Sequence, residues 1–532
     1  MRIRLTNCSL INKNLLILDR AIQIEDGLIE AKGSMQDSIR WPKADKELSL
    51  TGYIVLPGLM DAHMHLLNWA LRHNQPSLDD VRSIDELLLL LGNQVHKQQE
   101  EGDSRPIVLG GWNEELYPEH RPPTLQELDE ISGQIPIVLT RICGHVCVVN
   151  SAILRDFAWQ EFASKEPGSV GFDQDGQPNG FLSESAMMKL LSLHENMSNN
   201  KQKELLLLGL KSMAAYGLTA IASQETNSLD DLDFLTALME IYEKEEALPA
   251  YCAQIGLSHP DEIPEFLALR EEFRGHPDIT ISSIKLFKDG SLGGRTALLH
   301  EPYCDEPSKT GLDLIPYTDL LQWFQKANKA GVQLTIHAIG DRAIAEIISA
   351  FTEACRTDPE RANPNRHTII HCQITDDDLL RRLSETNLAV IAQPLFARSD
   401  WSMALSRLGE TRRNLAYDYR CVVDLGIHQA FSSDSPIESA NPLLTLAAAI
   451  DHPQPDKSLS LSEAVAASSV EVAYILGMEG KSGQLDPGSP ADITVIKARS
   501  EAELQAASLR QLSIALTIRE GKIIYRDPEI QY

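Results

Sequence analysis

The chain has 532 residues, 43% hydrophobic and 23% charged, a globular composition at a length that exceeds a single hydrophobic core. Its formal net charge of −28 argues against binding to nucleic acids or anionic membranes, because both are polyanions that attract Lys and Arg. The eight cysteines are widely spaced and no apolar run fits a signal peptide or a membrane span, so we expect reduced thiols and a cytoplasmic protein.

Short strand-like runs open and close the chain. The N-terminal runs are RIRLTNCSLI, AIQIEDGLIEAKG and ELSLTGYIVL, and Asp26-Gly27 between two apolar stretches predicts a hairpin. The C-terminal runs are ADITVIKA and SIALTIREGKIIYRD. We therefore predict one small β-sandwich domain, built from residues 1–55 plus 480–532, with the middle of the chain inserted between its two halves.

Strands and helices alternate through residues 56–479, and this pattern predicts a parallel sheet. Helical patterns such as Lys203–Tyr216, Leu320–Ala330 and Glu410–Leu425 fall between the strands. Eight such units predict a (β/α)8 TIM barrel. The strand signals are Ile54–His63, Thr219–Gln224, Pro249–Leu257, Ser282–Phe287, Gln333–His337, His367–His371, Leu388–Gln393 and Gln429–Ser433.

Residues 68–200, approximately, interrupt this alternation. They contain two apolar runs of their own, IVLGGW and PIVLTRI, and either could be a barrel strand that shifts the count. We favour an insertion after the first barrel strand, because the interval is far longer than one helix.

The strongest local signal is VLPGLMDAHMH, residues 55–65. Alternate residues of a strand face the same way, so His63 and His65 point together at the C-terminal end of a barrel strand, where barrel enzymes place their chemistry. Two imidazoles on one face suit a zinc-like ion. Because the motif is short, two unrelated histidines are the alternative interpretation.

Three later strands also end in side chains that can bind metal: His337, His371 and Asp434. Four strands that behave alike favour a metal site over chance. The chain moreover resembles the amidohydrolase superfamily, and specifically its YtcJ-like branch (the amidohydrolase-3 family), over nearly its whole length. The motifs that carry this resemblance are PGLMDAHMH, GWNEELYPEHRPPTLQELDEIS, GHVCVVNS, IKLFKDGSLGGRTALLHEPY, HAIGDRAI, IIHCQ, SSDSPIES and GQLDPGSPADITVI.

The resemblance implies a barrel with one or two divalent metal ions, zinc first and manganese or iron as alternatives. In the family, the fourth-strand lysine can be carboxylated and bridge two metals, and the eighth-strand aspartate binds metal and shuttles a proton. Six residues match the metal-binding positions on the first, fourth, fifth, sixth and eighth strands: His63, His65, Lys285, His337, His371 and Asp434.

Three alternatives concern the bridge between the metals. Lys285 could be an ordinary lysine in an ion pair beside a mononuclear site. Lys288 is a rival, but its odd offset turns it to the other face of the strand. Glu184, which lies in the insertion, is an alternative carboxylate bridge.

The substrate contacts are predicted from the loops. His145 is the candidate for an oxyanion or substrate contact, although Cys143 departs from the acidic or polar residue expected there. Asp289 and Arg295 follow the fourth strand, and Arg295 could hold a substrate carboxylate through two hydrogen bonds. Trp112 is a candidate for lining the pocket, with core packing as the equally supported alternative.

These residues predict hydrolysis of a carbon–nitrogen bond in an amide, N-formyl or N-acyl group by metal-bound hydroxide, with Asp434 transferring the proton. Deamination of a heterocycle is the alternative reaction. A non-catalytic barrel that serves as an assembly protein is a third hypothesis, against which the full ligand set argues. We expect a small-molecule substrate. A homodimer is an oligomeric state that the sequence leaves open.

Overall fold

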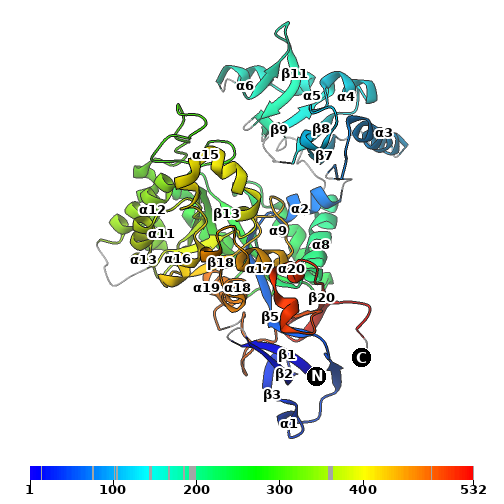
Figure 1. Cartoon of the computed structure of the whole chain (residues 1–532), viewed down its shortest axis with the longest axis vertical. Helices are drawn as coiled ribbons and strands as arrows, with labels where there is room; N and C mark the ends of the chain where they lie inside the picture. The colour runs from blue at the N-terminus through cyan, green and yellow to red at the C-terminus, as the bar shows by residue number, and fades with distance from the viewer. Residues whose placement is uncertain are drawn as a thin grey trace. The chain divides into compact units, whose positions relative to one another are not determined.

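The computed structural model describes residues 1–12, 15–74, 77–78, 80–100, 102, 106–142, 146–165, 168–183, 186–187, 189–190, 199–356, 363–480 and 482–530. The chain divides into two compact units, of which the larger joins Met1–Leu66 to Leu206–Tyr532 and the smaller is Leu67–Leu205 (Figure 1). Among the described residues, no helix combines the length and the apolar character that a membrane span requires.

Eight parallel strands of the larger unit form a nearly closed barrel, as the sequence predicts. In chain order each strand pairs with the next. The first and last strands meet where Asp434 N donates to His63 O (3.0 Å) and His65 N to Ser435 O (2.8 Å). The strands are β6 (Leu59–Met64), β12 (Leu218–Thr226), β13 (Ala250–Gly256), β14 (Ile279–Phe287), β15 (Leu334–Ala338), β16 (Thr368–His371), β17 (Ala389–Ala392) and β18 (Gln429–Phe431).

The first predicted strand, Ile54–His63, is in fact two strands. β5 (Ile54–Pro57) belongs to the terminal sheet and β6 to the barrel, with Gly58 between them. A Cβ at Gly58 would lie 2.5 Å from Thr219 Oγ1 and 2.9 Å from Asp492 Cβ. The chain therefore changes sheets at a position too crowded for any side chain.

Helices alternate with the barrel strands. The predicted helix Glu410–Leu425 is wrong as a single element, because one helix ends at Arg413 and the next begins at Tyr419, and Gly409 already interrupts the first with a φ of 71°. The helices are α8 (Asn199–Ala215), α9 (Asp233–Lys244), α10 (Ile263–Glu272), α11 (Tyr317–Ala330), α12 (Asp341–Ala354), α13 (Asp377–Ser384), α14 (Phe396–Ser399), α15 (Trp401–Arg413), α16 (Tyr419–Asp424), α17 (Pro442–Ile450), α18 (Leu461–Ala467) and α19 (Val470–Ile475).

Strands from both ends of the chain form one eight-stranded sheet, which confirms that the termini together build a β domain. β19 of the C-terminal segment pairs antiparallel with β5 of the N-terminal segment. The predicted hairpin at Asp26-Gly27 is present, with both residues at positive φ. The strands are β1 (Arg2–Asn12), β2 (Leu15–Glu25), β3 (Leu28–Ser34), β4 (Lys46–Ser49), β5, β19 (Ile493–Ile496), β20 (Ile514–Arg519) and β21 (Lys522–Arg526).

The smaller unit has its own five-stranded sheet, in the order β10-β11-β9-β8-β7. The runs IVLGGW and PIVLTRI are its strands β7 (Ile107–Trp112) and β8 (Ile137–Arg141), so neither contributes to the barrel. The other elements are β9 (Val146–Val149), β10 (Val170–Phe172), β11 (Pro178–Ser183), α2 (Leu66–His73), α3 (Ile84–Glu100), α4 (Leu125–Ile131), α5 (Ser151–Asp156) and α6 (Trp159–Lys165). The exact boundaries predicted for the domains stay a prediction.

Candidate metal centre

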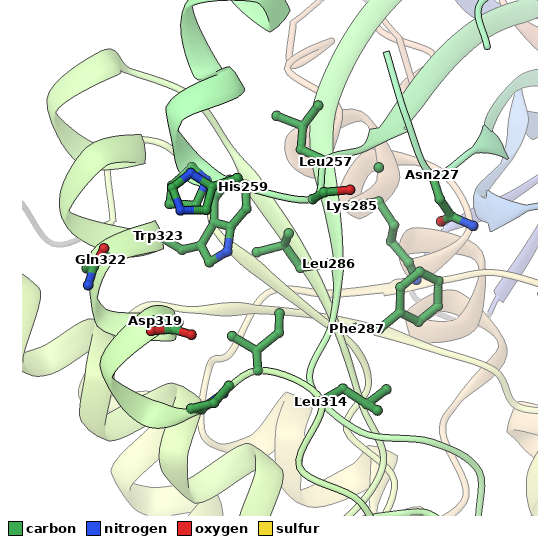
Figure 2. Close-up of a pocket in the computed structure, with 15 residues that line it drawn as sticks. Asn227, Leu257, His259, Lys285, Leu286, Phe287, Leu314, Asp319, Gln322 and Trp323 are labelled. Carbon is green, nitrogen blue, oxygen red and sulfur yellow. The ribbon is translucent and has the colours of Figure 1, made fainter. Parts of the chain in front are cut away.

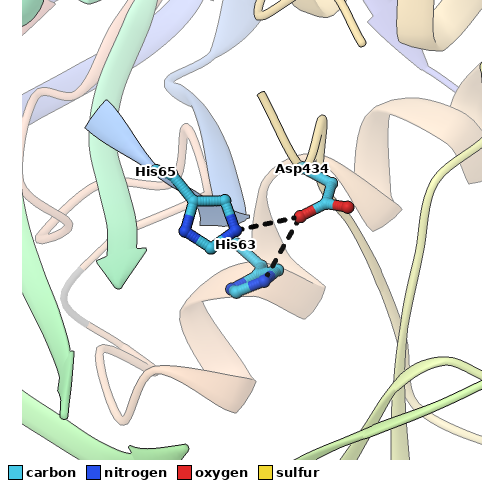
Figure 3. A group of neighbouring side chains, drawn as sticks. All are labelled: His63, His65 and Asp434. Carbon is cyan, nitrogen blue, oxygen red and sulfur yellow. Dashed lines mark ion pairs between the residues drawn. The ribbon is translucent and has the colours of Figure 1, made fainter. Parts of the chain in front are cut away.

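His63 and His65 lie at the end of β6, two residues apart, and their side chains meet Asp434 beyond β18 (Figure 3). Nε2 of each ring is 3.4 Å from Asp434 Oδ1. One ligand atom of each of the three residues lies within 4.8 Å of the others. The alternation of a β-strand, together with the pairing of the first and last strands, produces this cluster from residues about 370 positions apart in the chain.

Asp61 supports the cluster through hydrogen bonds to the backbone of both strand ends. Its carboxylate accepts hydrogen bonds from the backbone N–H of His63 (3.1 Å) and of Ser433 (3.2 and 3.1 Å). Burial raises the pKa of Asp61 to about 7. Asp61 thus links the ends of β6 and β18, and it positions both the histidine pair and the residue before Asp434.

The two first-strand histidines are held in one tautomer each. Nδ1 of His63 lies 2.6 Å from Oε1 of Gln254 on β13, and Nδ1 of His65 lies 2.9 Å from the backbone O of Gln224 on β12. These oxygens only accept, so each Nδ1 carries a hydrogen, and the neutral ring of His63 has its lone pair on Nε2, which faces Asp434. Such outer hydrogen bonds are the usual means of orienting a metal-ligating histidine.

The same arrangement holds for His337, on β15, and His371, on β16. Nδ1 of His371 faces Oε1 of Gln393 at 2.8 Å, and Nε2 of His337 faces the backbone O of Gly290 at 3.2 Å. Their remaining nitrogens, Nε2 of His371 and Nδ1 of His337, are 3.0 Å apart. The sequence pattern alone does not identify these glutamines; their one signal is a polar side chain within β13 (Gln254) or directly after β17 (Gln393), both apolar strands.

Lys285 lies on β14, the fourth barrel strand, and is 1% exposed. Its Nζ is 3.5 Å from Nε2 of His63 and 4.4 Å from the centre of the Phe287 ring. Burial lowers the pKa of Lys285 to about 7, although the charge of Asp434 opposes this shift. A substantial fraction of the amine is therefore neutral and nucleophilic at neutral pH.

Lys288, the rival position, is equally buried but faces a different set of partners. Its Nζ lies 2.6 Å from Glu346 Oε2, donates to the backbone O of Ile315 at 2.7 Å, and pairs with Asp313. Lys288 thus belongs to a structural ion-pair network, while Lys285 is the lysine that the structure brings to the histidines.

The electrostatics of the cluster suit a cation. Burial lowers the pKa of His371 to about 4 and the pKa values of His63 and His337 well below the ordinary value, so these three rings are neutral at neutral pH. Burial also opposes protonation of His65, but the hydrogen bond to Asp434 outweighs it and raises that pKa. Burial disfavours the charge of Asp434, yet the hydrogen bond from His65 and the neighbouring rings hold its pKa below the ordinary value.

Neutral imidazole nitrogens and one ionised carboxylate are the donors that zinc-like divalent ions prefer. The residues present therefore fit such an ion.

The loop residues predicted for the substrate have internal partners. Arg295 forms its two-pronged ion pair with Asp305, Nε to Oδ1 at 3.1 Å and Nη2 to Oδ2 at 3.0 Å. Asp289 accepts from the backbone N–H of Leu298 (2.9 Å), Ile339 (3.0 Å) and Gly340 (2.8 Å). Asp289 thereby ties together the loops that follow β14 and β15.

The remaining predictions fall in the smaller unit. Trp112 is 1% exposed, and its Nε1 donates to the backbone O of Leu139 at 3.1 Å within the core of that unit. Cys143, His145 and Glu184 lie outside the described residues.

Known proteins resemble the chain over almost its full length. The profile of the amidohydrolase family matches residues 46–525. Putative amidohydrolase YtcJ of Bacillus subtilis (strain 168) is 30% identical over 521 residues, 95% of this chain and 96% of that protein. N-substituted formamide deformylase of Arthrobacter pascens is 23% identical over 558 residues, 97% and 98% of the two chains. The crystal structure of an uncharacterized metal-dependent hydrolase from Pyrococcus furiosus has a TM-score of 0.73 and 25% identity, covering 93% of this chain and 98% of that chain.

Proposed function

The chain belongs to the amidohydrolase family, and from this premise we propose that it is a metal-dependent hydrolase that cleaves a carbon–nitrogen bond in an amide, N-formyl or N-acyl group. The similarity to a deformylase of N-substituted formamides supports this bond type. One observation carries the proposal: four histidines each direct one ring nitrogen to a protein oxygen, and their other nitrogens face Asp434 or one another.

Two sets of residues would hold the metal. His63, His65 and Asp434 form the first set, and His337 with His371 forms the second. Lys285 would supply the group that bridges the two sets, and its Nζ lies 3.5 Å from Nε2 of His63. When bound, a divalent ion lowers the pKa of a coordinated water from 15.7 to about 7 and polarises a carbonyl oxygen. We propose zinc as the first candidate, with manganese or iron as alternatives, because imidazole suits all three.

Lys285 supplies the bridge in this proposal after carboxylation. Its neutral amine nitrogen attacks the carbon of CO2, one proton leaves, and the product is a carbamate with two oxygens and one negative charge. The lowered pKa of Lys285 favours this reaction because only the uncharged amine has the lone pair that forms the new N–C bond. The carbamate would also neutralise part of the charge of two cations in a buried site.

Asp434 would transfer the proton from the attacking water to the leaving nitrogen. Its carboxylate is ionised at neutral pH, so one oxygen can accept the proton of an attacking water and return it to the leaving nitrogen. His65 lies 3.4 Å from Asp434 Oδ1 and holds that carboxylate in place. The leaving nitrogen therefore departs as a neutral amine rather than as an unstable anion.

A substrate screen tests this function. N-formyl and N-acyl amines are offered to protein loaded with zinc or with manganese, and release of formate, carboxylate or amine is measured. We expect turnover by at least one class, and its loss in the His63→Ala variant. Full turnover by His63→Ala would contradict the proposed centre, and less than one equivalent of bound metal with no activity on metal addition would contradict the proposed function.

A further inference from the structure

Three polar side chains gather at the C-terminal ends of the sixth, seventh and eighth barrel strands. Gln373 follows His371, at the end of β16, by two residues. Asp400 comes after β17, where α14 ends and α15 begins. Glu438 follows Asp434, beyond β18, by four residues. We call Gln373, Asp400 and Glu438 the acidic corner.

The acidic corner adjoins the candidate metal centre. The ring of Phe396 is stacked on the ring of His371, with 6.0 Å between the centroids and 9° between the planes. The backbone N–H of Asp400 donates to the backbone O of this same Phe396 at 2.9 Å. The charge of Asp434 acts directly on Glu438. A substrate bound at the centre therefore has the acidic corner within its reach.

Hydrogen bonds fix the inner part of the corner. Asp400 Oδ2 accepts from the hydroxyl of Tyr417 (3.0 Å) and from Nε2 of Gln373 (3.1 Å). The backbone N–H of Tyr417 in turn donates to the backbone O of Gln373 (2.8 Å). The buried Lys457 donates to the backbone O of Ala416 (3.1 Å) and so holds the segment that carries Tyr417. Asp400 and Gln373 are thus ordered before a ligand binds, which lowers the entropic cost of binding.

One buried acceptor of the corner has no partner. Gln373 is 3% exposed, and its Oε1 receives no hydrogen bond from the part of the chain that the structure describes. Turning the amide over does not correct this, because Oε1 would then face Asp400 Oδ2, and both atoms only accept. Oε1 shares its carbon with Nε2, so it lies beside the carboxylate of Asp400. A donor from a ligand would remove the cost of leaving this oxygen unpaired.

The outer part of the corner is negative and open to solvent. Asp400 and Glu438 are partly exposed, and Ser399, which forms a hydrogen bond with Glu438, is exposed. Burial raises the pKa of Glu438, and the charges of Asp400 and Asp434 raise it further against the effect of Ser399. Glu438 forms no ion pair with any described residue. A cation that enters from solvent would be attracted by both Asp400 and Glu438.

A primary ammonium group matches the acceptors of the corner. It has three N–H donors, one for the Gln373 oxygen and one for each of the two carboxylates. A hard cation such as Ca²⁺ takes about six to eight oxygen ligands, more than these three side chains supply. An anionic group would be repelled by Asp400 and Glu438, and an apolar group would leave the Gln373 oxygen unpaired.

We propose that the acidic corner binds a primary ammonium group of the substrate, located on the substrate at a distance from the bond that is cleaved. The substrate class is then an amide, N-formyl or N-acyl compound that carries a positive charge. This inference rests on the proposed function, because the bond to be cleaved would lie at the adjoining metal centre.

Asp319 offers a second carboxylate that would attract the same cation. A cavity of about 530 Å³ lies at the ends of β13 and β14, where Lys285 and Phe287 line it together with Asp319 of α11 (Figure 2). Of the six candidate metal ligands, all of which are described, Lys285 alone lines this cavity. Asp319 is exposed, and the third and fourth strands lie across the barrel from the seventh and eighth. Asp319→Asn is therefore a matched control for the variants of the corner.

The test measures binding of hydroxamates, whose two oxygens chelate the metal, so that it does not depend on turnover. Calorimetry gives the affinity of the zinc-loaded protein for ω-aminoalkanohydroxamates with chains of increasing length between the carbonyl and the ammonium. Each compound is compared with the alkanohydroxamate that has a methyl group in place of the ammonium. The variants are Glu438→Gln and Asp400→Asn, which remove a charge and keep the shape of the side chain.

We expect one chain length at which the ammonium compound binds the wild-type protein at least about tenfold more tightly than its methyl analogue does. Glu438→Gln and Asp400→Asn should each reduce this preference by about threefold or more, because a hydrogen bond to a charged group is lost. Asp319→Asn should leave the preference unchanged. The affinity for the methyl analogue should stay at the wild-type value in all variants, which also shows that they are folded.

Equal binding of the ammonium and methyl compounds at every chain length would overturn the inference. A preference that Asp319→Asn removes and Glu438→Gln retains would overturn it as well. Absence of all hydroxamate binding would reject the metal centre and the inference with it. Hydrolysis of ω-amino amides is then measured on the same proteins. A preference that depends on the corner, combined with no hydrolysis of any amide, would retain the binding site and reject the proposed function alone.

Discussion

Nε2 of His371 lies 3.0 Å from Nδ1 of His337, and in both rings the other nitrogen is the one that faces a protein oxygen. Each neutral ring has one hydrogen, which goes to Gln393 or to Gly290, so two lone pairs face one another. Both pKa values are lowered by burial, and protonation therefore does not relieve this repulsion at neutral pH. A divalent cation held by both nitrogens would relieve it.

Metal binding should therefore stabilise the fold. We expect a chelator to lower the unfolding temperature and zinc to restore it, because an ion at 100 times its Kd stabilises the bound state by about 2.7 kcal/mol. Differential scanning calorimetry measures this shift. In His371→Leu the zinc-dependent shift should shrink, because one of the ring nitrogens that would hold the ion is gone. A His371→Leu variant with the wild-type zinc shift would contradict this account.

The buried glutamines should control metal affinity without touching the metal. Replacing Gln254 or Gln393 with Leu removes the oxygen that fixes a histidine tautomer, and such changes typically weaken metal binding by about 10–100-fold. Zinc affinity is measured by competition with a chromophoric chelator. Gln23→Leu is the matched control, because Gln23 is equally buried but lies in the terminal sheet, where its oxygen accepts from Arg4. Equal zinc affinity in all three variants would refute the orienting role.

The sequence predicts the strands and the residues at their ends more readily than the side-chain contacts between distant segments. His63 and His65 are two residues apart on one strand, so strand periodicity alone turns them to the same side. The fourth, fifth, sixth and eighth strands are identified by short apolar runs, and parallel pairing then brings their ends together without further information. For this reason the strand pattern is sufficient to predict that Asp434 lies near His63 and His65, whereas Lys285 is predicted only through the resemblance to the amidohydrolase-3 family.

The contacts that orient the centre could not be predicted in the same way. Gln254 is 191 residues from His63, and no local pattern relates an amide on the third strand to an imidazole on the first. For Arg295 the type of partner could be predicted but not its identity. A guanidinium prefers a carboxylate, but which carboxylate it meets, Asp305, depends on the path of the loop. The break at Gly58 is likewise set by Thr219 and Asp492, both distant in the chain.

Substitution of Lys285 should lower the metal content, whereas substitution of Lys288 should lower the unfolding free energy. Lys285→Ala should lose at least one equivalent of bound metal, and a short carboxylate such as propionate should restore activity in part, because it supplies the two oxygens of the carbamate in the vacated space. Lys285→Arg should not be rescued, since the guanidinium keeps its charge. Metal analysis and activity against added propionate measure these effects, and labelling with 13CO2 should give a carbamate carbon signal only when Lys285 is present.

Lys288→Met is the comparison for this prediction. It leaves Glu346 paired with Arg342 alone and Asp313 without its lysine partner. Because both carboxylates are partly exposed, the expected loss of unfolding free energy is about 1–3 kcal/mol. Its metal content per folded molecule should stay at the wild-type value. Loss of metal in Lys288→Met, or none in Lys285→Ala, would reverse the two assignments.

His367 should make the fold sensitive to acid. Its ring is buried between Phe324 and Phe351, its Nδ1 accepts from the backbone N–H of Leu334 (2.9 Å), and burial lowers its pKa to about 3. An unfolded histidine titrates near 6.5, so between about pH 6.5 and 3 the unfolded chain binds a proton that the folded chain does not. The unfolding free energy should therefore fall as the pH falls through this window, by up to about 1.4 kcal/mol per pH unit from this residue alone, and the effect should be absent above pH 6.5.

Urea unfolding of the metal-free protein at several pH values measures the slope of unfolding free energy against pH. The His367→Gln variant keeps an acceptor for Leu334 but cannot titrate, so its slope should be shallower. Identical slopes for the variant and the wild type would show that His367 is not the group responsible.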